Sequence, residues 1–196
     1  MKLTRDELME AVRSQMPASR WNHTAGVMTT AVQLAEQYGV DPVKADLAAL
    51  LHDVVKYWPT SKMEQIIREQ QLPCDLLLHD KVLWHAPVGA VVAERDYGVN
   101  DVEILDAIRY HTSGRVQMTM LDKVICLADY MEPGRDFPGV NQIRELSKHN
   151  LEKALLAGLD STISFLIEKG ARIYPLTIDA RNALIEEIKA GATVNE

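Results

Sequence analysis

Residues 45–56 read ADLAALLHDVVK, and this stretch determines how the rest of the chain is interpreted. Its first seven residues are apolar with one exception, as in a helix that is buried on most sides. His52 and Asp53 follow at its end, and Pro59 requires the helix to stop before it. Neighbouring side chains on an ideal helix point about 100° apart, so one metal ion can use both only where a helix ends. The stretch therefore predicts a buried helix that ends in a His-Asp metal-binding pair.

Signals for helices recur along the whole chain, whereas the alternation of apolar and polar residues that marks a strand is missing. N-cap residues, capping-box spacings and terminating glycines delimit the predicted helices. We predict helices over residues 20–38 after Ser19, 42–51 after Asp41, from Ser61, 87–97, from Asn100, 118–131, 151–169 and about 176–190. The predicted fold class is all-α. Residues 1–196 are expected to form one domain, with the last helix packed as a C-terminal extension and residues 54–83 as a small insertion.

The composition excludes several classes of function. The 21 basic and 28 acidic residues give a net charge of −7, so the chain has no general electrostatic attraction for nucleic acid. No stretch approaches the roughly 18 apolar residues of a membrane-spanning helix, and the N-terminus lacks the apolar region of a signal peptide.

Cys74 and Cys126 lie far apart, which favours two buried apolar side chains in a reducing cytoplasm over a disulfide or a thiolate zinc site. A homodimer formed through the Met- and Leu-rich helices is compatible with this composition.

Two further residues complete a candidate metal site. His23 lies on the helix that precedes the His-Asp pair, and Asp129 lies on a much later helix. Together with His52 and Asp53 they offer two nitrogens and two carboxylates, a set that suits iron, manganese or zinc better than calcium. Fewer than six protein ligands leaves open positions for water and a phosphate oxygen, as a hydrolytic metal requires.

Five short motifs occur in a fixed order around these residues. They are RWNH (20–23), ALLHDVVK (49–56), HAPVGA (85–90), IRYHT (108–112) and KVICLADYMEPGR (123–135), and the tail RIYPLT (172–177) follows them. This set resembles the YqeK family of bacterial HD-domain proteins, which are symmetrical diadenosine tetraphosphatases. The resemblance extends from about residue 20 to residue 181. It implies an HD-domain helical bundle with a metal site between helices, and the cleavage of diadenosine tetraphosphate to two ADP.

The resemblance also assigns roles to individual residues. The divalent metal, expected to be iron with manganese or cobalt as alternatives, would be bound by His23, His52, Asp53 and Asp129. The dinucleoside polyphosphate and its ADP product would contact Arg20, His23, Asp53, Lys56, His85, His111, Asp129, Arg135, Arg172, Tyr174, Pro175 and Thr177.

The expected catalytic residues are Asp53, Lys56, His85 and His111. Asp53 would bind metal and orient the attacking water, while Arg20 and Lys56 would neutralise charge on the phosphate. His85 and His111 would bind phosphate when protonated, or supply a proton to the leaving ADP. Water would attack one of the two central phosphorus atoms.

Each of these assignments has a structural alternative. Arg20 and Lys56 could be salt-bridge partners, His85 could lie in a helix-capping region, and His111 could be a cation at a helix C-terminus. Arg135 could be a solvated loop charge, and the tail could serve only to dock the last helix. His85 and His111 could also hold a second metal ion.

Two other functions compete with the leading one. An HD phosphohydrolase acting on nucleoside mono- or triphosphates or on cyclic nucleotides would use the same metal ligands. A non-catalytic module that binds a nucleotide or a partner protein is the third reading, but it has no need of four ligands from three helices.

Overall fold

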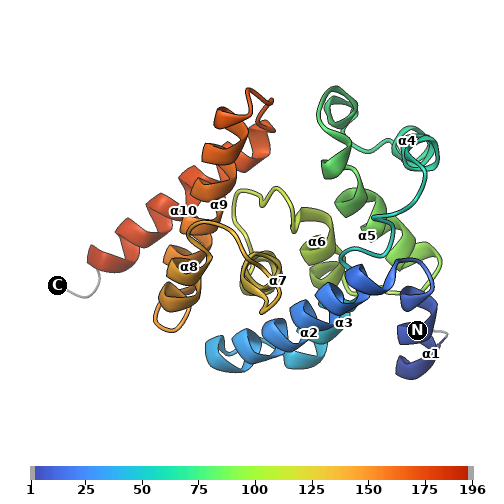
Figure 1. Ribbon diagram of the computed structural model, residues 1–196, viewed down its shortest axis with the longest axis horizontal. Coiled ribbons are helices and arrows are strands. Elements are labelled where there is room, and N and C mark those ends of the chain that lie inside the picture. The colour runs from blue at the N-terminus through green and yellow to red at the C-terminus, as the bar shows by residue number, and fades with distance from the viewer. Residues whose placement is uncertain (1–2, 194–196) are drawn as a thin grey trace.

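The computed structural model of the protein describes residues 3–193, apart from the side chains of Cys74 and of residues 192 and 193. These residues form ten α-helices and two short 3₁₀ helices, with no strand among them (Figure 1). In chain order the elements are α1 (Arg5–Arg13), α2 (Ala18–Tyr38), α3 (Pro42–Leu51), α4 (Thr60–Glu69), η1 (Cys74–Leu78), η2 (Lys81–Leu83), α5 (His85–Arg95), α6 (Val102–Tyr110), α7 (Met120–Met131), α8 (Val140–Leu146), α9 (Leu151–Glu168) and α10 (Pro175–Thr193). The predicted all-α fold class is confirmed.

The helix α3 begins as the sequence predicts. The Asp41 side chain accepts hydrogen bonds from the backbone N–H groups of Val43 and Lys44, and Pro42 occupies the first helical position. Proline fits there because its missing N–H would have had no partner within the helix. The last residue of the helix is Leu51, so the His-Asp pair does lie at a helix end.

Three predicted N-caps are wrong, each for a local reason. Ser19 and Ser61 lie inside the first turns of α2 and α4, which begin directly after Pro17 and Pro59. Proline disfavours helical backbone at the residue before it, so each proline marks an earlier start than the serine does. The helix α6 starts after Asp101 rather than after Asn100, because the Asp101 carboxylate accepts a hydrogen bond from the backbone N–H of Glu103.

The sequence reading missed two helices. The first, α1, begins with a capping box in which Thr4 and Glu7 bond each other's backbone N–H groups. The second, α8, has seven residues and follows Gly139, whose φ of 94° is accessible chiefly to glycine. A helix this short has too few turns to give a clear periodic pattern.

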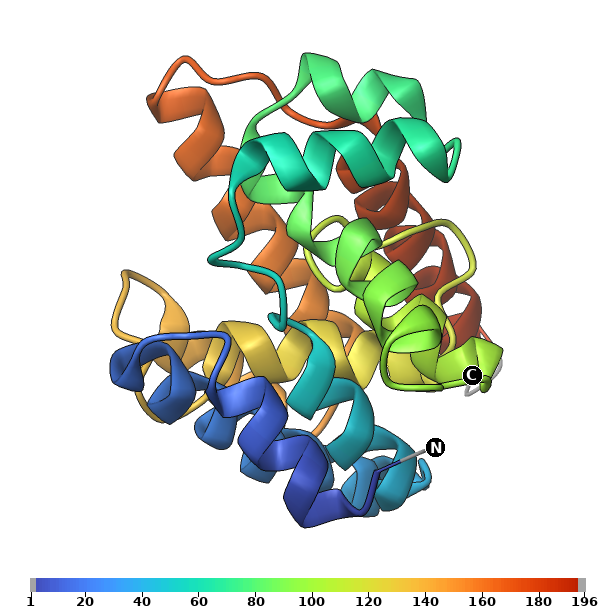
Figure 2. The ribbon, with the colours of Figure 1, turned by 90° about the vertical axis from the view of Figure 1, so that its right-hand side faces the viewer.

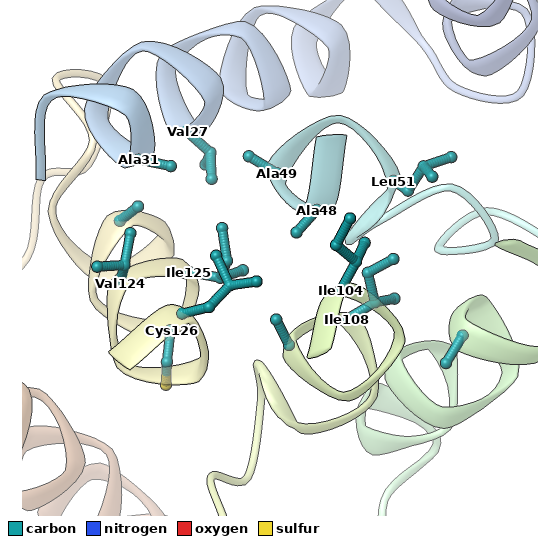
Figure 3. Packing of buried hydrophobic residues seen from close by; sticks show 14 of the residues in the cluster. Val27, Ala31, Ala48, Ala49, Leu51, Ile104, Ile108, Val124, Ile125 and Cys126 are labelled. Atoms are coloured by element: carbon teal, nitrogen blue, oxygen red, sulfur yellow. The ribbon is translucent and has the colours of Figure 1, made fainter. Parts of the chain in front are cut away.

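The core lies between α2, α3, α6 and α7. Figure 3 shows Val27 and Ala31 of α2 and Ala49 of α3 on one side of this core, with Ile108 of α6 and Ile125 of α7 facing them. All five side chains are fully buried. Small alanines on α2 and α3 allow the two backbones to approach closely, and the branched side chains of α6 and α7 fill the remaining space. The ends of these four helices are thereby fixed relative to one another.

Two parts of the molecule pack outside these four helices. The short helices of residues 60–83 lie at the opposite end of the molecule from α2, and α10 runs beside α9 (Figure 2). Within the described residues, no helix is long and apolar enough to cross a membrane. Cys126 is a buried free thiol, as expected, whereas the side chain of Cys74 lies outside the described residues.

Candidate metal centre

The His-Asp pair is completely enclosed. His52 is the C-cap residue of α3, and the chain continues through turns to Trp58. The exposed fractions of His52 and Asp53 are 0% and 2%. Their side chains meet within the pair, since His52 Nε2 lies 3.2 Å from Asp53 Oδ2. Burying two polar groups without compensating contacts is costly, so their surroundings must supply partners or a ligand.

Three histidines at helix ends are oriented in the same way. Each places its Nδ1 within hydrogen-bonding distance of the backbone carbonyl three residues earlier, where only a protonated nitrogen can donate. The pairs are His52 with Ala49 O at 2.6 Å, His85 with Val82 O at 2.6 Å, and His111 with Ile108 O at 2.8 Å. In the neutral ring this leaves Nε2 with a lone pair. All three Nε2 atoms lie within 4 Å of an Asp53 oxygen.

His23 from α2 and Asp129 from α7 reach the same point. His23 Nε2 lies 3.0 Å from Asp129 Oδ1 and 3.8 Å from Asp53 Oδ2. The rings of His23 and His52 have their centroids 5.6 Å apart. The packing of α2, α3 and α7 therefore brings together all four residues that the sequence suggested as metal ligands.

The chemistry of this cluster fits a divalent cation. His23 Nε2, His52 Nε2 and Asp53 Oδ1 are buried and have no hydrogen-bond partner among the described residues. One ligand atom from each of His23, His52 and Asp129 lies within 4.8 Å of the other two. Buried polar atoms are normally paired, and a metal ion would satisfy all of these together. Imidazole and carboxylate ligands suit iron, manganese, cobalt or zinc.

A second group of potential ligands adjoins the first. His52, Asp53 and His111 offer atoms within 4.8 Å of one another. His85 also takes part, because its Nε2 lies 3.0 Å from Asp53 Oδ1 and 3.1 Å from His111 Nε2. The second ion considered from the sequence would therefore find nitrogen and carboxylate ligands here.

Electrostatics define the charge states in this cluster. Burial works against ionisation of Asp53, but His52 and His85 hold the pKa of its carboxyl well below the usual range. Asp129 is partly buried, with 21% of its side chain exposed, and His23 and Arg135 keep its pKa well below the usual range. Both carboxylates are therefore ionised at neutral pH, as metal ligands must be.

The expectation that His85 and His111 bind phosphate as cations is not supported. Burial, together with the neighbouring His85 and His52, lowers the pKa of His111 to about 3. Burial also lowers the pKa of His85, and the adjacent Lys56 adds to the effect. Both rings are therefore neutral near pH 7, with Nε2 available to accept or to ligate.

Three cationic side chains border the carboxylates. Arg20 Nη1 donates to Asp53 Oδ2 at 2.9 Å, and Arg135 donates from Nη2 to Asp129 Oδ1 and from Nε to Asp129 O. Lys56 Nζ lies 3.2 Å from His85 Nε2 and 3.8 Å from Asp53 Oδ1. Burial lowers the pKa of Lys56. Arg20 therefore does form a salt bridge, as the structural alternative supposed, but its partner is Asp53 of the metal-binding cluster.

The sequence reading missed Glu132. Its Oε1 lies 3.1 Å from His23 Nδ1, and its exposed fraction is only 4%. In the sequence it directly precedes Pro133 and Gly134, a pattern that is typical of the end of a helix. A signal was available, since Glu132 follows the candidate ligand Asp129 by only three residues.

The tail lies against a different part of the molecule. Arg172 is exposed and donates to Leu78 O at 3.0 Å, while the Tyr174 ring meets His79 edge-on with centroids 5.0 Å apart. Tyr174 and Pro175 line a cavity of about 360 Å³. Thr177 is buried. The structure thus brings this part of the predicted site to the η1 segment rather than to the histidine cluster.

Comparison with known proteins defines the family. The family model described as HD domain matches residues 20–134, more than half of the chain. The chain belongs to the HD-domain family. The matched range begins at the first of the five motifs and ends within the last one, and the HD-domain family predicted from the sequence is confirmed.

Several relatives of this HD-domain protein bear the name symmetrical bis(5'-nucleosyl)-tetraphosphatase. The relative from Bacillus subtilis is 47% identical over 93% of this chain and 98% of its own length. Those from Halalkalibacterium halodurans and Staphylococcus aureus are 42% and 44% identical, covering 95% and 87% of this chain and 100% and 89% of theirs.

A solved structure supports the HD-domain fold. It is the 1.50 Å crystal structure of a protein from Clostridium acetobutylicum that is described as a predicted HD superfamily hydrolase involved in NAD metabolism. It is 38% identical, superposes with a TM-score of 0.90, and covers 94% of this chain and 98% of its own.

Proposed function

We propose that this HD-domain hydrolase cleaves diadenosine tetraphosphate symmetrically into two ADP, using a divalent metal ion held by His23, His52, Asp53 and Asp129. The observation that carries the proposal is the convergence of these four side chains from three helix regions, with unpartnered ligand atoms facing one another. Near-full-length relatives that bear the name of this activity support the substrate.

The charges around the site suit a polyphosphate. The protein is acidic overall, with a net charge of −7, yet Arg20, Lys56 and Arg135 gather at this one place. Guanidinium groups offer two parallel donors to phosphate oxygens, and their charge is fixed at every working pH. The proposed role of these cations is to bind the phosphates next to the metal and to offset the charge that develops in the reaction.

The proposed division of labour follows the charge states. A bound divalent ion would supply Lewis acidity to a phosphoryl oxygen and to the attacking water. Asp53, ionised and enclosed, would orient that water through an oxygen not used for binding. The neutral His85 and His111 would accept at Nε2 and keep the water in line with phosphorus. Lys56, whose pKa is lowered by burial, would donate its proton to the leaving ADP.

Symmetry of the products follows from the position of attack. The substrate is symmetric about its middle bridging oxygen, and water would attack one of the two phosphorus atoms that flank it. The bond from that phosphorus to the middle bridge then breaks. Each half keeps one adenosine and two phosphates, so both products are ADP.

The tail has a proposed role at some distance from the metal. The cavity that Tyr174 and Pro175 line also includes Tyr110 and Thr112, and Thr112 directly follows His111 in the chain. Aromatic and apolar walls of this kind suit a nucleoside. We place Arg172, Tyr174, Pro175 and Thr177 in substrate binding on this basis, as contacts or supports for one nucleoside. Residues 1–196 would then act as one domain.

Product analysis tests this function. Metal-free protein would be supplemented separately with iron, manganese or cobalt, with iron expected to be the most effective, and incubated with diadenosine tetraphosphate in ¹⁸O-labelled water. We expect ADP as the only product, with one ¹⁸O atom in the β-phosphate for each substrate cleaved. The variant Asp160→Ala, a half-exposed carboxylate on α9, should behave like the wild type.

Other outcomes would replace the proposal. Labelled ATP or AMP would keep the hydrolase but overturn the site of attack. If no metal supports turnover of diadenosine tetraphosphate but mononucleotides or cyclic nucleotides are hydrolysed, the metal site acts on another class of substrate. Tight ADP binding without metal and without turnover would favour a nucleotide-binding module.

A further inference from the structure

Glu132 lies directly behind His23 and has no role in the chemistry proposed above. Its Oε1 is 3.1 Å from His23 Nδ1, while His23 Nε2, on the other side of the same ring, lies 3.0 Å from Asp129 Oδ1. A carboxylate can only accept a hydrogen bond, so Nδ1 is the protonated nitrogen and Nε2 keeps its lone pair. A carboxylate that supports the far side of a histidine in this way fixes the orientation of the ring and raises its basicity as a ligand.

The position of Glu132 is fixed from two sides. Its second oxygen, Oε2, accepts the N–H of Gly134 at 2.6 Å. Arg144 of α8 donates to the backbone carbonyls of Met131, Glu132 and Arg135, at 3.0, 2.9 and 2.8 Å. A buried acidic side chain with both oxygens in use has little freedom to swing away. The loop after α7 therefore holds this carboxylate at a defined place against α2.

Two glycines make room for the carboxylate. A Cβ atom added to Gly26, which lies three residues after His23 on α2, would be 2.5 Å from Glu132 Oε2. A Cβ atom on Gly134 would be 3.0 Å from Oε1. Glycine inside a helix lowers its stability relative to alanine, so the position of Gly26 calls for a local reason. The space that Glu132 needs supplies that reason.

We propose that Glu132 is a positioning residue that orients the His23 ring and directs Nε2 toward the metal, and that Gly26 provides the space for it. This inference rests on the metal site of the proposed function. It concerns metal binding itself and can therefore be measured without substrate.

The test is the affinity of the metal-free, full-length protein for Mn²⁺, measured by isothermal titration calorimetry. Glutamine at position 132 has one acceptor oxygen for two donors, so Glu132→Gln should weaken Mn²⁺ binding by about 10- to 100-fold. Gly26→Ala keeps every ligand and Glu132 itself but displaces the carboxylate, and it should weaken binding by at least about tenfold. The matched control is Glu145→Gln on the surface of α8, which should bind as the wild type does.

A second measurement separates positioning from folding. If Glu132 only capped the loop through Gly134, Glu132→Gln would lower the melting temperature of the metal-free protein without altering Mn²⁺ affinity. Under the proposal, the visible absorption spectrum of the Co²⁺-loaded protein should also change in Glu132→Gln and in Gly26→Ala. A double variant should be no weaker than the poorer single variant, because both changes remove the same contact.

The outcomes are distinct. Mn²⁺ affinities within twofold of the wild type and unchanged Co²⁺ spectra in both variants would overturn this inference alone. Absence of Mn²⁺ and Co²⁺ binding by the wild type would overturn the metal site and, with it, this inference. If Glu132→Gln does not fold, Gly26→Ala decides the question, since it retains every polar group of the site.

Discussion

Both ends of α7 carry charged side chains that are at least partly buried, but the charges at the two ends have different surroundings. At the N-terminal end Lys123, 5% exposed, places its ammonium group 3.0 Å from Glu152 and 2.6 Å from Glu187. At the C-terminal end Asp129 Oδ1 lies 3.0 Å from His23 Nε2, and the Nε2 atoms of His23 and His52 have no hydrogen-bond partner among the described residues. The first arrangement is complete within the protein, whereas the second calls for a cation.

The two ends therefore have different roles: the ion pairs of Lys123 stabilise the packing of helices, whereas the residues around Asp129 form a binding site for a cation. Lys123 joins α7 to α9 and α10, so its ion pairs act on the fold. The residues around Asp129 hold ligand atoms close together without hydrogen-bond partners, which lowers the stability of the metal-free protein. A bound ion would offset this loss of free energy. Substitutions at the two ends should therefore alter different measurements.

The largest effect is expected at the metal centre. Asp53→Ala removes a carboxylate that lies near all four histidines of the cluster. We expect loss of bound metal and a fall in kcat of at least roughly 10³-fold, equivalent to about 4 kcal/mol. Metal content by atomic emission and ADP release would be measured on the same sample. Full metal content and full turnover in Asp53→Ala would show that Asp53 is not part of the metal site.

Arg135 should give the next largest effect. Arg135→Ala removes two hydrogen bonds to Asp129 and a proposed phosphate contact, so kcat/KM should fall roughly 10²-fold, or about 2–3 kcal/mol. Arg135→Lys keeps the charge without the paired donors and should lie between the alanine variant and the wild type. Equal activity of the two variants would show that the geometry of the guanidinium is unimportant.

At the other end of α7 the effect should appear in stability alone. Lys123→Met leaves Glu152 and Glu187 without their shared cation, and the free energy of unfolding should fall by about 2 kcal/mol in urea denaturation. Turnover by the folded variant should not change. Lys148→Met, which breaks the exposed pair with Glu145, is the matched control and should cost less than about 0.5 kcal/mol. A large loss of kcat in Lys123→Met would contradict the separation of the two ends.

The smallest effect concerns the pH dependence of the metal-free protein. The pKa of His111 falls from 6.5 to about 3 on folding, so the unfolded chain takes up the proton more readily. The resulting contribution to stability is fully present above pH 6.5 and is lost as the pH falls toward 3. Between pH 7 and 5.5, wild type should lose about 1 kcal/mol more than His111→Asn does. Parallel pH profiles of the two proteins would contradict the neutral state of His111.

The sequence predicted the parts of the site that depend on order along the chain. His52 and Asp53 could be placed at a helix end because apolar residues lead up to them and Pro59 follows. The charge states of His85 and His111 could not be foreseen, since they arise from burial by helices that are distant in the sequence. Glu132 was missed because its contact with His23 spans 109 positions. The tail was assigned to the substrate, but its contacts with residues 78 and 79 could be seen only in three dimensions.

The carbonyl contacts of His52, His85 and His111 have a consequence for how the centre acquires its ion. Each ring is oriented by the backbone of its own turn, so three of the rings are already arranged before any metal arrives. Little conformational entropy then remains to be lost on capture. Metal uptake should accordingly be rapid, with the loss of water from the ion as its slowest step. Ions that exchange their bound water slowly should therefore bind more slowly than ions that exchange it rapidly.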